Sequence, residues 1–87
     1  MYYVYILLSI KDSKFYIGYS ADLKIRIKAH QSGQVISTKT RLPLKLVYYE
    51  AHLSKTDAKR RESYFKTAKG KSSLRQMIKN SLLKWHK

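Results

Sequence analysis

YYVYILLSIKDSKFYIGYS, residues 2–20, is the stretch that decides the expected fold. It contains two runs rich in Tyr, Ile, Val and Leu, residue types that favour β-strands. The polar segment between the runs includes Asp12 and Ser13, which are common in turns. The pattern predicts two antiparallel strands, about residues 2–9 and 15–19, joined by a short turn.

The hairpin holds five of the chain's eight tyrosines, together with Gly18 in its second strand. Pairing of the two strands can bring Tyr5 and Tyr16 close together, although the turn length leaves the register open. The first strand is apolar on both faces, which is typical of a strand that is central or covered on both sides. Aromatic residues also stabilise hairpins by themselves, so the tyrosines alone do not indicate a functional site.

A helix is predicted at residues 21–32, directly after the hairpin. Ser20 is expected to cap its start, Asp22 lies in its first turn, and Gly33 follows its end. Residues 34–43 then form a polar connection.

A third strand is predicted at residues 44–52. Simple alternation divides its side chains between two faces, with Leu44, Leu46 and Tyr48 on one and Lys45, Val47 and Tyr49 on the other.

The remaining residues predict two helices. SKTD, residues 54–57, is a variant of the capping box and opens a helix that continues to about residue 69, with Gly70 at its end. The expected buried stripe of this helix consists of Ala58, Phe65 and Ala68. Ser72 or Ser73 is expected to cap a last helix that runs to about residue 84. The apolar face of the last helix consists of Leu74, Met77, Ile78, Leu82 and Trp85.

The predicted elements follow one another as β-β-α-β-α-α, within the α+β class, and residues 1–87 are expected to form a single domain. The absence of cysteine excludes a disulfide framework and a zinc–thiolate site. No apolar run approaches the roughly 18 residues of a membrane span, and the N-terminus has no secretory signal pattern. We therefore expect a cytoplasmic protein without a membrane partner, and the oligomeric state stays open.

Positive charge is the strongest feature of the composition. The chain has 19 Lys and Arg against five Asp and Glu, a formal net charge of +14. Such an imbalance favours a polyanionic partner, and nucleic acid is the first candidate. A solubilising surface rarely needs so one-sided a balance, and no basic amphipathic segment is set apart to bind an anionic membrane.

Arg26 and His30 lie in unusual positions on the first predicted helix. Leu23 and Ile27 mark its buried stripe, and Arg26 and His30 flank that stripe one turn apart. A charged arginine beside a buried stripe needs a partner or an opening there. The alternatives are an arginine whose stem is buried while its charge reaches solvent, and a hydrogen-bonded core histidine.

Glu62 is distinguished from the other four carboxylates by elimination. Asp12 lies in a turn, while Asp22 and Asp57 lie in the first turns of helices, where a negative charge is favourable. Glu50 near the end of the third strand has many cations to pair with. Glu62 falls on an expected buried stripe, and a pair with Lys66 would not explain burial of its charge. A single divalent ion such as Mg²⁺ would explain it, because Mg²⁺ uses one or two carboxylates together with waters and substrate phosphates.

These residues in order resemble the GIY-YIG nuclease domain. The resemblance rests on the tripeptides Tyr3-Val4-Tyr5 and Tyr16-Ile17-Gly18, followed by Arg26, His30 and Glu62, and it spans about residues 2–71. It is closest to small bacterial members of the family. The resemblance implies a three-stranded antiparallel sheet flanked by helices and a single-metal endonuclease that hydrolyses phosphodiester bonds in DNA.

The resemblance also implies roles for the five residues. Tyr5 and Tyr16 would be the two motif tyrosines, at least one of which positions or deprotonates the attacking water, with a phenolate made more accessible by the Arg, the His and a metal around it. Arg26 would bind the scissile phosphate, and His30 would carry a proton or position the water. Glu62 would bind one Mg²⁺ or Mn²⁺ ion.

This chain departs from the family pattern at several positions. Tyr3 stands where the family motif has Gly, and Tyr19 stands where some relatives have Lys. Asn80 is too far beyond Glu62 to take the role of the Asn that some relatives use.

Other cations are candidates for nucleic-acid contacts, with DNA favoured over RNA. Four are selected, in the polar connection and near the end of the second predicted helix: Lys39, Arg41, Lys66 and Lys69. The alternative function is a nucleic-acid-binding module that keeps this scaffold with little or no cleavage.

Overall fold

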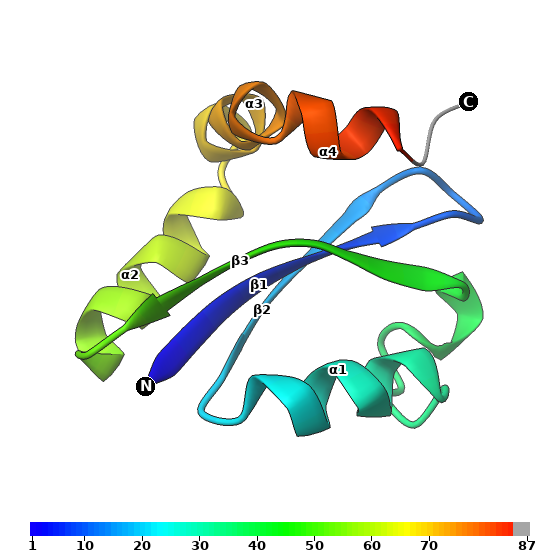
Figure 1. The fold of residues 1–87 in the computed structure, drawn as a ribbon, viewed down its shortest axis with the longest axis horizontal. Coiled ribbons are helices and arrows are strands. Elements are labelled where there is room, and N and C mark those ends of the chain that lie inside the picture. Colours follow the sequence, from blue (N-terminus) through cyan, green and yellow to red (C-terminus); the bar gives the residue numbers. More distant parts are fainter. Residues whose placement is uncertain (85–87) are drawn as a thin grey trace.

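Three strands form one antiparallel sheet in the order β2-β1-β3, in a computed structural model that describes residues 1–84 (Figure 1). β1 is Tyr2–Ser9, β2 is Phe15–Ser20 and β3 is Leu44–His52. The central position of β1 agrees with its two apolar faces. The bounds of the strands match the sequence prediction to within one residue.

Helices cover both faces of this sheet (Figure 1). Helix α1, Leu23–Gln31, packs on one face. The opposite face is covered by α2, Lys55–Phe65, α3, Ala68–Met77, and α4, Lys79–Leu83. A short 3-10 helix, Lys39–Arg41, precedes β3. The predicted α+β class and element order are confirmed.

No helix within residues 1–84 is long and apolar enough to cross a membrane.

Each face of the sheet has its own hydrophobic core. Val4 belongs to the core under α2 and α3, together with Phe65 and Leu74. The next residue of β1, Tyr5, belongs to the core under α1, together with Ile27. Because side chains alternate along a strand, β1 contributes to both cores and carries the Tyr5 phenol into the α1 side.

The N-terminus of α1 differs from the prediction. Asp22, not Ser20, is the N-cap, and its Oδ1 accepts a hydrogen bond from the Ile25 amide at 3.1 Å. Ser20 Oγ instead accepts from the Asp22 amide at 3.0 Å. The helix therefore starts two residues later than expected, because Ser20 is used to hold the turn that leads into it. Gly33 follows the helix with φ of +79°, as its predicted position requires.

The junction of α2 and α3 corrects a second prediction. Ser54 caps α2 as expected, but the helix ends at Phe65, and Thr67 caps α3 by accepting from the Gly70 amide at 2.9 Å. Gly70 thus lies in the first turn of a helix and does not end one. A Cβ atom there would collide with the carbonyl of Tyr64, so close approach of the two helices requires glycine. Ala68 is exposed, contrary to the expected stripe.

The last predicted helix is divided by Ile78, which separates α3 from α4. Leu74 and Ile78 are buried and Leu82 packs against the same core, as predicted. Met77 is 49% exposed, so its assignment to the core was wrong. Ser72 and Ser73 lie inside α3 and cap no helix. Trp85 lies outside the described residues.

A bulge in β3 overturns the predicted alternation of its side chains. Ile6 pairs with Tyr48 while Leu7 pairs with Leu46, so Val47 is an extra residue on β3. Leu46 therefore packs on the α1 side, whereas Tyr48 packs on the opposite side. Beyond the bulge, Tyr49 returns to the α1 side.

Glu50 attaches β3 to α2. Its carboxylate accepts two hydrogen bonds from the Arg61 guanidinium, at 2.7 and 3.0 Å, and one each from Tyr48 and His52. Burial acts to raise the pKa of Glu50, but these donors outweigh it and lower the pKa to about 2. Glu50 is therefore a structural carboxylate, as the expected pairing with a cation implied.

Candidate active site

Four of the predicted site residues converge on the α1 side of the sheet. Tyr5 comes from β1, Tyr16 from β2, and Arg26 and His30 from α1. The Tyr5 hydroxyl lies 2.8 Å from His30 Nε2, and Arg26 Nε donates to the same hydroxyl at 3.4 Å. The ring centroid of Tyr16 lies 6.5 Å from that of Tyr5 and 5.0 Å from that of His30. We call these four residues the tyrosine cluster.

Strand register explains how the two tyrosines meet. Tyr5 pairs with Gly18 and Leu7 pairs with Tyr16, so Tyr5 and Tyr16 are diagonal neighbours on one face. The Tyr5 ring extends across Gly18, where an added Cβ atom would collide with Cζ and the hydroxyl of Tyr5. Glycine at this position therefore leaves the space in which the Tyr5 hydroxyl reaches His30.

Thr38 is a fifth member that the sequence did not reveal. Its Oγ1 lies 2.8 Å from His30 Nδ1, and both side chains are fully buried. His30 therefore has a partner on each ring nitrogen, which fixes the orientation of the ring. Residue type carried no signal, because Ser37 and Thr40 offer similar hydroxyls in the same polar connection.

The connection that carries Thr38 is held against the hairpin turn. The Arg41 guanidinium pairs with Asp12 at 2.8 Å and donates to the carbonyls of Lys14 and Phe15. Ser9 Oγ donates to the Arg41 carbonyl at 2.6 Å. Arg41 thus has a structural role that places Thr38 beside His30, and its contact with a nucleic acid stays a prediction.

Burial sets the proton affinity of the cluster. Burial, and then the nearby Arg26 charge, lowers the pKa of His30 to about 4, so its imidazole is neutral at pH 7. Burial also raises the pKa of Tyr5, although Arg26 acts in the opposite direction. The side chains around Tyr5 therefore do not by themselves make its phenolate more accessible, because desolvation outweighs the attraction of Arg26; the expected effect of Arg, His and a metal together stays a prediction.

Arg26 combines exposure with fixed contacts. The hydrogen bond with Tyr5 is the largest influence that raises the pKa of Arg26, and Tyr16 adds to it. The residue as a whole is exposed to solvent. A guanidinium has five N–H donors, so contact with the tyrosines leaves donors for an oxyanion.

Glu62 lies on α2, and its contacts are separate from the hydrogen bonds of the cluster. Its side chain is only 13% exposed, and its two oxygens pair with Lys59 at 3.1 Å and Lys66 at 3.3 Å. The pair with Lys66 that the helix spacing allowed is therefore present. The negative charge of Glu62 also acts to raise the pKa of Tyr5, so the carboxylate is within electrostatic reach of the cluster.

One carboxylate limits the kind of metal site that is possible. No group of three or more His, Cys, Asp or Glu side chains suited to a metal occurs in the described part of the chain. Mg²⁺ or Mn²⁺ coordinated by Glu62 would complete its shell with water and substrate oxygens. Lys59 and Lys66 are more than half exposed, so both can move away from a carboxylate that binds a cation. The donor set fits a single, loosely held divalent ion.

The other candidate cations lie in two places. Lys39 is exposed on the 3-10 helix, near Thr38. Lys66 and Lys69 are exposed at the junction of α2 and α3, where Lys66 is the partner of Glu62. The three lysines are exposed and so are accessible to a polyanion, and their contact with a nucleic acid stays a prediction.

Comparisons with known proteins identify related chains. The sequence model of the GIY-YIG catalytic domain matches residues 1–76. A UPF0213 protein of Staphylococcus haemolyticus is 40% identical over 77 residues, which cover 87% of this chain and 93% of that protein. A UPF0213 protein of Clostridium perfringens is 41% identical over 85 residues, which cover 97% of this chain and 89% of that protein. The solution NMR structure of the UPF0213 protein BH0048 from Bacillus halodurans is similar with a TM-score of 0.56 and 40% identity, over 88% of this chain and 85% of that one.

Proposed function

Because the chain belongs to the GIY-YIG family, we propose that it is a metal-dependent endonuclease that hydrolyses phosphodiester bonds in DNA. The observation that carries the proposal is the chain of contacts from Arg26 through Tyr5 to His30. It joins a phosphate-binding group to two groups that can move a proton. The net charge of +14 supplies the attraction for a polyanionic substrate.

Hydrolysis of a phosphodiester needs an activated water, stabilisation of the added negative charge and relief of a poor leaving group. Arg26 serves the second need, because its exposed guanidinium can offer two parallel donors to phosphate oxygens. Its contact with Tyr5 brings the bound phosphate next to the phenol.

Tyr5 and His30 serve the first need as a proton relay. The Tyr5 oxygen accepts a proton from the attacking water while its own proton passes to His30 Nε2, at 2.8 Å. Nε2 is free to take this proton when Nδ1 carries the hydrogen of the neutral ring and donates a hydrogen bond to Thr38 Oγ1, which holds the ring in that tautomer. This route needs no free phenolate, in agreement with the raised pKa of Tyr5.

Binding of the substrate phosphate should make His30 a stronger base. The positive charge of Arg26 contributes to the low pKa of His30. A phosphate bound to Arg26 offsets that charge, so the pKa of His30 rises and the imidazole accepts a proton more readily. Tyr16 packs against both rings and holds the relay in place.

Glu62 serves the third need. A divalent cation, Mg²⁺ or Mn²⁺, held by Glu62 would supply positive charge to the leaving oxygen. Lys59 and Lys66, its partners in the free protein, hold this carboxylate in position until then.

The test compares two carboxylates of α2. Purified protein is incubated with plain, nicked and branched DNA duplexes in Mg²⁺ or Mn²⁺, and the products are separated on a denaturing gel. Glu62→Gln should lower cleavage by about 100-fold or more while DNA binding is kept. The matched control is Asp57→Asn, an exposed carboxylate on the same helix that pairs with Arg60. Full activity of Glu62→Gln would refute the assigned metal ligand.

The second candidate function is DNA binding with little cleavage. It is favoured by the pairing of both Glu62 oxygens with lysines. Inactivity of the wild-type protein on all of these duplexes, with binding that weakens as salt rises, would select this alternative.

A further inference from the structure

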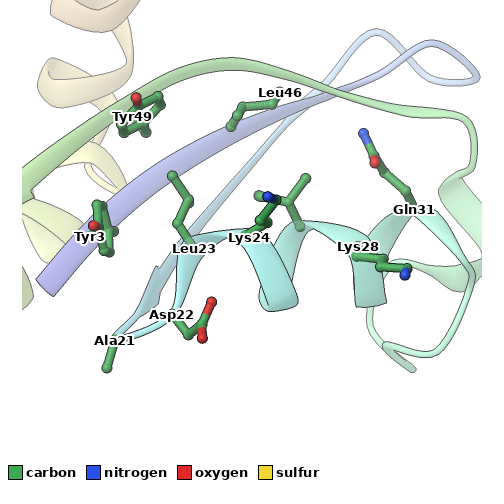
Figure 2. Close-up of a pocket in the computed structure, with 10 residues that line it drawn as sticks. Tyr3, Ala21, Asp22, Leu23, Lys24, Lys28, Gln31, Leu46 and Tyr49 are labelled. Atoms are coloured by element: carbon green, nitrogen blue, oxygen red, sulfur yellow. The ribbon is translucent and has the colours of Figure 1, made fainter. Parts of the chain in front are cut away.

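A groove lies between α1 and β3, on the side of α1 away from Arg26. It has a volume of about 710 Å³, within the range of roughly 300–1,000 Å³ that is usual for ligand pockets. Figure 2 shows side chains from three elements facing it: Tyr3 of β1, Leu23 and Lys24 of α1, and Leu46 and Tyr49 of β3. None of the residues of the tyrosine cluster lines it.

Two tyrosines form one end of the groove. The rings of Tyr3 and Tyr49 lie 6.3 Å apart with 58° between their planes, and Tyr49 is 52% exposed. Leu23 and Leu46 continue the apolar floor from the tyrosines along the groove (Figure 2). An exposed aromatic ring beside an apolar floor suits a flat, weakly polar group that can stack.

Cations lie along the helical side of the groove. Lys24 and Lys28 are one turn apart on α1, and both residues line the groove. Asp22 also lines the groove, at the start of α1, where its carboxylate is used as the helix cap. The lysines therefore make this side of the groove attractive to an anion.

A nucleotide has both of the features that the groove suits, because it carries a flat base and an anionic phosphate. We propose that the groove binds an unpaired nucleotide of the DNA substrate, with its base against Tyr49 and its phosphates near Lys24 and Lys28. The proposal rests on the proposed function, and it specifies the substrate class. A base must be unpaired here, because the faces of a paired base are covered by its neighbours in the duplex.

The position of the groove favours DNA in which paired and unpaired segments meet. Lys24 and Lys28 lie about 160° around α1 from Arg26, at about 100° per residue. A helix is roughly 10–12 Å across with its side chains, so a strand at Arg26 and an unpaired segment in the groove can lie on the two sides of α1.

Other occupants fit less well. A second copy of the chain would bring another net charge of +14, so the two would repel. An acidic peptide would satisfy the lysines but would leave the ring of Tyr49 without a stacking partner.

The experiment measures binding in EDTA, so that no cleavage occurs. Fluorescence anisotropy compares a blunt duplex with the same duplex carrying a single-stranded thymidine extension. The wild-type protein should prefer the extended duplex, and Tyr49→Ala should lower affinity for that DNA by about 5- to 150-fold, the usual contribution of stacking one base. Tyr49→Phe retains the ring and should keep the preference. Equal binding of both DNAs by the wild-type protein, or an unchanged preference in Tyr49→Ala, overturns the proposal.

Two further arms separate the alternatives. The variant Lys24→Ala/Lys28→Ala should weaken the preference more than Lys79→Ala/Lys84→Ala, which removes the same charge from exposed positions on and next to α4. Poly-glutamate that competes as well as oligothymidine would identify an acidic peptide as the better occupant and reject the nucleotide.

Glu62→Gln should keep the preference for the extension while cleavage is lost, so failure of the nuclease proposal and failure of the groove proposal give different results.

Discussion

Tyr5 depends on three other residues for its position. Gly18 leaves room for its ring, Arg26 donates to its oxygen, and His30 lies within hydrogen-bond distance of it. Gly18 comes from β2, whereas Arg26 and His30 come from one face of α1. A small change at any of the three contacts therefore moves the phenol that the proposed relay uses.

Gly18→Ala tests the space over which the Tyr5 ring passes. The added methyl group collides with the ring, so we expect cleavage to be lost and the free energy of unfolding to fall by about 1–3 kcal/mol. Denaturant unfolding and the cleavage assay measure the two effects. In a double-mutant cycle, Gly18→Ala should cost much less in a Tyr5→Ala background, where the ring is absent. Equal costs in both backgrounds would show that the ring is not the cause.

The buried histidine predicts how stability depends on pH. The pKa of His30 is about 4 in the folded protein and about 6.5 when unfolded, so the unfolded state binds more protons between these values. The free energy of unfolding should therefore decrease as pH falls from about 6.5 to about 4. Glu50 has a pKa of about 2 in the folded protein, so it should lower the free energy of unfolding further only below about pH 4.5.

Chemical denaturation at a series of pH values measures this dependence. In His30→Asn, the decrease in the free energy of unfolding between pH 6.5 and 4 should be absent. The decrease at lower pH should remain. A wild-type protein with constant stability across the upper window would contradict a buried, neutral His30.

At the scale of elements, the sheet is the rigid part that positions both proposed sites. β1 carries Tyr5 toward the tyrosine cluster and Tyr3 toward the groove, two residues apart on one face. The bulge at Val47 returns Tyr49 to that same face. The alternation of side chains along β1 and the bulge in β3 therefore determine which side chains lie on the face that α1 covers.

Helix α2 is attached to the sheet by the pair of Arg61 and Glu50. Arg61→Ala would leave a carboxylate that is only 16% exposed without its two-point partner, so we expect a loss of about 2–4 kcal/mol in the free energy of unfolding. Arg60→Ala is the matched control, because Arg60 pairs with Asp57 at an exposed site and should cost less than about 1 kcal/mol. Equal effects of the two variants in denaturant unfolding would exclude the assigned role of Glu50.

At the scale of the whole molecule, the net positive charge and the tyrosine cluster have different proposed roles. The net charge of +14 favours nucleic acid of any sequence, whereas the proposed reaction needs one phosphate at the tyrosine cluster. The lysines that could bind the backbone lie on several elements, including the 3-10 helix and the junction of α2 and α3.

The affinity for duplex DNA should therefore fall steeply with salt. Each neutralised phosphate contributes about 0.9 log unit of binding constant per log unit of salt concentration. Glu62→Gln should keep this slope, because Glu62 contributes no positive charge. Anisotropy titrations at several salt concentrations measure it, and binding that does not change with salt would argue against nucleic acid as the partner.

The sequence by itself determined the strands and the order of the elements, and it selected the candidate site residues. Strand bounds follow from local alternation and residue preference, which need no knowledge of the rest of the chain. Arg26 and His30 could be selected because they occupy positions that a plain core would give to apolar residues. Glu62 was selected as a candidate in the same way, by its place on a helical stripe.

Only the tertiary structure decided which of these residues meet and how they titrate. The partnership of Thr38 with His30, the anchoring of Arg41 by Asp12 and the bulge at Val47 depend on contacts between segments distant in the chain. No local pattern encodes them, because many hydroxyls and cations are equivalent until packing brings one into contact. The raised pKa of Tyr5 likewise follows from burial, which is a property of the folded protein as a whole.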